Sequence, residues 1–141
     1  MKIIDLNVLI NAVNEDLPHH IKAKKWLEMQ LNGTESVGIP WLVILGFIRI
    51  MTNGKIYPNP LSEVQATELV DAWLIDPLVR IPRPEPGHWN LVKELIIETG
   101  TAGNLTSDIH LAAIAIGQGA KLVTLDADFS RFRGLRWEKP F

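Results

Sequence analysis

The fold is decided by residues 1–10, which read Met1-Lys2-Ile3-Ile4-Asp5-Leu6-Asn7-Val8-Leu9-Ile10. Ile3, Ile4 and Leu6 form the short apolar run that is typical of a buried parallel strand. The apolar residues that follow have helical spacing and predict a helix: Val8, Leu9, Ile10, Ala12 and Val13. Asp5 therefore falls at the junction between a predicted strand and a predicted helix.

A carboxylate at such a junction needs a partner, because moving an unpaired carboxylate out of water is costly. In open α/β sheets, ligands bind in the crevice outside the carboxyl ends of the strands, and Asp5 would point toward that crevice. The position predicts that Asp5 binds a cation or a ligand.

Composition limits the kinds of site and the architecture. With 141 residues, 47% of them hydrophobic, the chain can bury one good core, and we predict a single domain over residues 1–141. It has no cysteine, so any metal would be held by oxygen or imidazole, and carboxylates favour magnesium or manganese. A formal net charge of −2 gives no general attraction to nucleic acid.

The sequence predicts neither a membrane segment nor a signal peptide. Its longest apolar run, Trp41 to Ile48, is far shorter than the ~18 residues of a membrane span. An acid stands where a signal peptide would be apolar. We therefore expect a soluble cytoplasmic protein.

Strands and helices alternate along the rest of the chain at βαβ spacing. Further strands are predicted at 36–39, 78–81, 121–125 and about 135–137, and helices at 19–31, 41–52, 63–75 and 88–99. A last helix, from Ile109 to Gln118, is opened by Thr106-Ser107-Asp108. In the helix at 19–31, the apolar residues predicted to face the core are Ile21, Trp26, Leu27 and Leu31. The alternation predicts an α/β fold.

Two further acids fall at element ends. Asp108 lies in the first turn of a helix, and Asp126 follows the strand at 121–125. Alone, Asp108 could complement the helix N-terminus, and Asp126 or Asp128 could cap a turn. Crowded carboxylates raise one another's pKa unless a divalent cation neutralises them. Asp5, Asp108 and Asp126 together therefore predict a shared magnesium site suited to phosphoryl chemistry.

Three motifs carry a resemblance to a known family: Asp5-Leu6-Asn7-Val8-Leu9, Thr106-Ser107-Asp108-Ile109-His110-Leu111-Ala112-Ala113 and Leu122-Val123-Thr124-Leu125-Asp126-Ala127-Asp128-Phe129. With these three motifs in this order, the chain resembles the PIN-domain ribonuclease toxins of the VapC type, found in bacterial and archaeal toxin–antitoxin pairs. The resemblance implies a three-layer α/β/α PIN-like sandwich with a short parallel sheet.

The resemblance also implies an activity and partners. Asp5, Asp108 and Asp126 would be the catalytic residues and would hold Mg²⁺ or Mn²⁺ for endonucleolytic cleavage of RNA. Asn7 and Thr124 would orient these acids, with Asp128 as an auxiliary member. A homodimer and a small antitoxin are implied as well, and the apolar helix that begins at Trp41 is the candidate dimer surface.

The chain departs from the family at Gly46, where the third helix usually carries a glutamate. The missing acid would mean weaker metal binding, an altered water ligand or lost activity. Close helix packing is the simpler interpretation, since a mid-helix glycine costs about 1 kcal/mol against alanine. Arg49, on the same face, could contact an RNA phosphate or form a structural ion pair with an aspartate. His110 faces away from Asp108 and is not expected to act as a general base.

Two alternatives to the nuclease stay open. A catalytically weak or inactive PIN-like binding module would use the acids for structure or for a partner, and the missing glutamate favours it. A haloacid-dehalogenase-like phosphatase also has an aspartate after its first strand, but its motif needs a second aspartate in place of Asn7.

Overall fold

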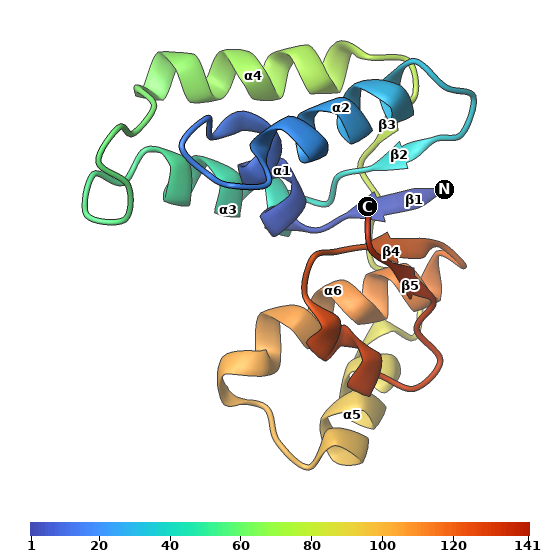
Figure 1. Cartoon of the computed structure of the whole chain (residues 1–141). Helices are drawn as coiled ribbons and strands as arrows, with labels where there is room; N and C mark the ends of the chain where they lie inside the picture. Colours follow the sequence, from blue (N-terminus) through green and yellow to red (C-terminus); the bar gives the residue numbers. More distant parts are fainter.

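The computed structural model describes residues 1–141 and contains a parallel five-stranded sheet between two layers of helices (Figure 1). The strands are β1 (Lys2–Ile4), β2 (Val37–Gly38), β3 (Val79–Arg80), β4 (Lys121–Val123) and β5 (Trp137–Glu138). Their spatial order is β3-β2-β1-β4-β5, and every neighbouring pair is parallel. β1 is therefore the central strand, and its carboxyl end lies beside that of β4.

The helices form two layers, one on each side of the sheet (Figure 1). One layer contains α1 (Leu6–Val13), α2 (His20–Leu31), α3 (Trp41–Met51) and α4 (Glu63–Ile75). The other contains α5 (His88–Thr99) and α6 (Thr106–Gly117), and short 3-10 turns lie at η1 (Gly103–Leu105) and η2 (Ala127–Arg131). The predicted α/β/α sandwich is confirmed. None of these helices has the length and apolar character that crossing a bilayer requires.

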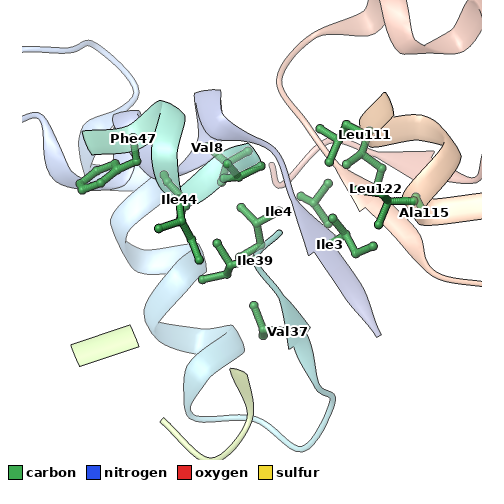
Figure 2. Close-up of a cluster of buried hydrophobic side chains, with 14 of the residues drawn as sticks. Ile3, Ile4, Val8, Val37, Ile39, Ile44, Phe47, Leu111, Ala115 and Leu122 are labelled. Atoms are coloured by element: carbon green, nitrogen blue, oxygen red, sulfur yellow. The ribbon is translucent and has the colours of Figure 1, made fainter. Parts of the chain in front are cut away.

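The core packs on both faces of β1. Figure 2 shows Ile4 on the side of Val8 and Ile44, and Ile3 on the side of Ala115 in α6. Ile3 and Ile4 are fully buried, and each such side chain contributes about 1.5–3 kcal/mol relative to an exposed one. This packing fixes the end of β1, and with it the position of Asp5.

Two details of the predicted elements are wrong. Leu6 belongs to α1 and not to the first strand, because the carboxylate of Asp5 accepts the Leu6 N–H at 2.7 Å and so caps a helix that begins at Leu6. Ile21 does not face the core, since its side chain is 79% exposed. The buried face of α2 is made by Ala23, Trp26 and Leu27, and Ile21 lies on the opposite side of the helix.

Candidate active site

Asp5 lies where β1 ends and α1 begins, and it is only 8% exposed. Its Oδ1 accepts the N–H of Leu6, and its Oδ2 accepts the hydroxyl of Thr124 at 2.7 Å and the side-chain amide of Asn7 at 2.8 Å. These three donors hold the carboxylate in one orientation. Asn7 and Thr124 thus contact Asp5 directly.

The same network joins the ends of β1 and β4. The Thr124 hydroxyl oxygen also accepts the side-chain amide of Asn7 at 3.1 Å and the backbone N–H of Asp126 at 3.0 Å. In return, Oδ1 of Asn7 accepts the backbone N–H of Leu125 at 3.1 Å. Because the two strands are parallel neighbours, this network places Asp5 and Asp126 at the same edge of the sheet.

Burial raises the pKa of Asp5 from 3.8 to about 6, although the hydrogen bonds from Thr124 and Leu6 oppose this effect. The negative charges of Asp108 and Asp126 raise the pKa further. Asp5 therefore titrates near neutral pH, and its charged form is held at a cost that a nearby cation would relieve.

The raised pKa predicts a pH dependence of stability for the metal-free protein. The folded protein holds the Asp5 proton more tightly than the unfolded chain does, because the folded pKa is about 6 and the unfolded value is 3.8. This tighter proton binding stabilises the folded protein. The stabilisation is fully present below the unfolded pKa and is lost as the pH rises through the folded pKa, which lowers the free energy of unfolding by about 3 kcal/mol. Urea unfolding in EDTA should show wild type losing stability relative to Asp5→Asn over this range. A constant difference between the two proteins would contradict the expectation.

Asp108 occupies the first turn of α6, as predicted, and is half-buried without a protein hydrogen bond to its carboxylate. Burial raises its pKa, as do the negative charges of Asp126 and Asp128, while Arg131 lowers it. Asp126 caps the 3-10 turn η2, since its Oδ1 accepts the N–H of Asp128 at 2.8 Å. The capping interpretation of Asp126 therefore holds, and its charge also acts on Asp5 and Asp108.

The acids do not all converge on one point. No group of three or more acidic and histidine side chains lies close enough together to enclose a metal ion. Asp5 and Asp108 line one cavity, and Asp126 does not line it. Asp128 is exposed and lies 3.8 Å from the guanidinium of Arg131.

The cavity that contains Asp5 and Asp108 has a volume of about 100 Å³. Besides the two acids, its lining is Leu6, Leu42, Val43, Gly46, Arg49, Ser107 and Leu111. Gly46 and Arg49 therefore face the acids. Arg49 is an exposed residue and forms none of the ion pairs in the chain, so the predicted alternative of a structural ion pair is not observed.

Gly46 also packs against a neighbour. A Cβ atom at this position would lie 2.8 Å from Cδ2 of Leu6, well inside van der Waals contact. Gly46 therefore lines the acid cavity and also leaves room for a packed side chain. Sequence reasoning missed this contact of Leu6.

His110 lies outside the cavity. Its Nδ1 is 2.9 Å from Nε2 of His88 in α5, and burial together with His88 lowers the pKa of His110. This agrees with the prediction that His110 faces away from Asp108. Sequence reasoning missed two residues of the site: Ser107, which lines the cavity, and Arg131, which lowers the pKa of Asp108. The position of Ser107 directly before Asp108 is a signal that could have found it.

Comparison with known proteins shows the family. The sequence profile of the PIN domain matches residues 2–135. Ribonuclease VapC37 of Mycobacterium tuberculosis is 39% identical over 140 residues, which are 99% of this chain and 97% of the relative. Ribonuclease VapC43 of the same organism is 38% identical over 140 residues, 99% of this chain and 95% of the relative.

The fold has solved counterparts. VapBC2 from Rickettsia felis, bound to a DNA fragment from its promoter, matches with a TM-score of 0.72 at 20% identity, over 98% of this chain and 97% of that chain. Fold, motif order and nearly full-length sequence similarity agree. The chain belongs to the PIN-domain family and is of the VapC type.

Proposed function

We propose that the chain is a metal-dependent endoribonuclease and the toxin of a toxin–antitoxin pair. The observation that carries the proposal is that Asp5 and Asp108 line one cavity together with Arg49, which forms no ion pair. The charge of Asp126 acts on both acids from the end of β4. Relatives that are 34–39% identical over nearly the whole chain are named ribonucleases.

The residues fit Mg²⁺ or Mn²⁺. Carboxylates are the hard oxygen donors that these ions prefer, and Asp108 has no protein partner for its oxygens. Full convergence of the three acids is not required, because Mg²⁺ usually binds one or two carboxylates and completes its shell with water and substrate phosphate. We propose Asp5, Asp108 and Asp126 as the residues that hold the ion, with Asp128 as an auxiliary member.

A divalent cation in this site would activate water and stabilise the charge that develops on the phosphate. The residues of the chain would orient the acids and bind the phosphate. Thr124 and Asn7 fix the carboxylate of Asp5, which is mostly ionised above its pKa of about 6. Arg49 is free to bind a phosphate oxygen of the RNA in a charge-assisted hydrogen bond.

RNA cleavage by the pure protein tests the proposal. We expect a mixture of short single-stranded RNAs and transfer RNA to be cut in MgCl₂ or MnCl₂, and to remain intact when EDTA is added. Cleavage that continues in EDTA would contradict the metal-dependent mechanism. A protein that binds RNA or a partner but never cuts would instead favour the inactive binding module.

We expect Mg²⁺ to raise the melting temperature at neutral pH, because an ion that binds only the folded state stabilises it by mass action, by about 2.7 kcal/mol at a hundredfold excess over Kd. Asp5→Asn should abolish the rise. Asp71→Asn is the matched control, since Asp71 is an exposed acid of α4 outside the cavity. Equal shifts in all three proteins would place the ion elsewhere.

Two partners follow from the same family membership. We propose a small antitoxin, since structurally similar proteins were solved as VapBC pairs, and a homodimer through α3. Trp41 and Leu45 lie one turn apart on α3 and are 49% and 63% exposed, so this predicted buried helix has an uncovered apolar stripe. Light scattering of the pure protein tests the dimer. An RNA substrate and an antitoxin both imply action in the cytoplasm.

The phosphatase alternative is disfavoured by Asn7. This residue stands where the phosphatase motif needs a second aspartate, and its amide both donates to Asp5 and accepts from Leu125. A carboxylate could not donate to Asp5 in the same way. The network therefore favours an orienting amide over a second catalytic acid.

A further inference from the structure

The acid-lined cavity has an apolar half that the proposed phosphate chemistry does not use. Four of the nine lining residues are apolar and make up this half: Leu6, Leu42, Val43 and Leu111. The volume of about 100 Å³ is several times the roughly 10–15 Å³ that one water needs. The cavity therefore has room for a group several times larger than one water.

The shape of the apolar half depends on Gly46. Because position 46 has no Cβ, Cδ2 of Leu6 can occupy space that lies 2.8 Å from where that atom would be. Any other residue at position 46 would displace Leu6 and project its own side chain into the cavity. The pair Leu6 and Gly46 thus gives the site an apolar wall where an acidic side chain would make it polar.

We propose that this wall is a nucleobase subsite, which receives the base of the nucleotide whose phosphate is bound by Arg49. The inference rests on the proposed nuclease function and names the part of the RNA that the site holds. Arg49 is the single basic residue in the lining and has no ion pair, so a phosphate can bind it without displacing a protein partner. A nucleotide combines an anionic phosphate with a flat apolar face, and the cavity offers a partner for each.

The chemistry of the wall predicts what it distinguishes. Leu6 and Leu42 have no hydrogen-bonding side-chain groups, so they contact the face of a base and not its edges. Contact with a base face is tolerant of sequence, because all four bases have such a face. The base must also be unpaired and unstacked to enter, which selects single-stranded segments of RNA.

Nucleoside 5′-monophosphates test the subsite without cleavage, since they contain no phosphodiester bond. Ribose 5-phosphate is the matched probe that has no base. We expect amide resonances of Leu6 and Gly46 to shift in NMR titrations in MgCl₂, with the four nucleotides binding about tenfold more tightly than ribose 5-phosphate because the base buries apolar surface against the leucines. Leu6→Ala, or Leu42→Ala as a second variant, should remove this preference.

Two further variants separate the base from the phosphate. Leu69→Ala removes a half-buried leucine of α4 outside the cavity and should keep the preference for nucleotides. Arg49→Gln should weaken nucleotides and ribose 5-phosphate to the same extent, because both carry the phosphate. Leu6→Ala and Arg49→Gln thus each remove one half of the recognition, and Leu69→Ala removes neither.

Three outcomes would overturn the subsite: equal affinity for nucleotides and ribose 5-phosphate, no binding of either probe, or a preference that survives both Leu6→Ala and Leu42→Ala. RNA cleavage is scored separately. Mg²⁺-dependent cleavage without base-dependent binding would overturn the subsite and leave the nuclease standing. Base-dependent binding without cleavage would overturn the nuclease and support the subsite.

Discussion

Asp108→Asn is expected to lower the rate of RNA cleavage by about 10²- to 10³-fold, the loss typical of removing one group that stabilises charge in the transition state. The fold should remain intact. The carboxylate of Asp108 has no hydrogen bond to lose, and the negative charge of Asp126 raises its pKa, so removing the charge relieves repulsion. The free energy of unfolding should therefore hold or rise.

Cleavage rates in MgCl₂ and urea unfolding of the same preparations check this expectation. Asp126→Asn should lose cleavage to a similar degree and should also keep its fold. The side-chain oxygen of asparagine can still accept the N–H of Asp128 and so cap η2. Asp71→Asn is the control and should behave as wild type. A mutant that unfolds, or one that cuts RNA at the wild-type rate, would show the replaced acid to be structural.

The fold could be predicted because short apolar runs alternate with helical patterns, and because the runs of β1 and β4 end in polar residues. Asp5 marked the end of β1 from the sequence alone, and all five strands and six helices lie where the alternation places them. The errors concern faces and boundaries. The apolar character of Ile21 predicts a core position, but this residue lies on the side of α2 opposite to Ala23 and Leu27.

The site was harder to predict because it depends on contacts between distant residues. Thr124 and Asp5 are 119 positions apart, and only the pairing of β1 with β4 brings them together. The roles of Asn7 and Thr124 came from the family resemblance. The contact of Leu6 with Gly46 depends on how α1 packs against α3, and no local pattern in the sequence signals it.

Gly46→Glu alone is expected to destabilise the protein by about 1–3 kcal/mol, the usual cost of overpacking. Glutamate has the better helical propensity, by roughly half a kcal/mol, but its Cβ would lie 2.8 Å from Cδ2 of Leu6. The clash is with the end of a flexible, half-buried side chain and not with backbone. It should therefore be relieved when Leu6 is shortened.

The double variant Leu6→Ala/Gly46→Glu decides what the glycine means. The stability changes of the two replacements should be non-additive by about 1–2 kcal/mol. Shortening Leu6 makes room for the glutamate, and the glutamate fills space that the shortened side chain leaves. Position 46 lines the cavity of Asp5 and Asp108, so the new carboxylate can hold the ion or its water, and Mg²⁺ affinity should rise by about tenfold over Leu6→Ala alone. Calorimetric titration with Mg²⁺ and urea unfolding of wild type, both single variants and the double variant measure both effects. A double variant that recovers stability without gaining Mg²⁺ affinity would mean that Gly46 serves only the packing of Leu6, and that the chain binds its ion without a fourth acid at this position.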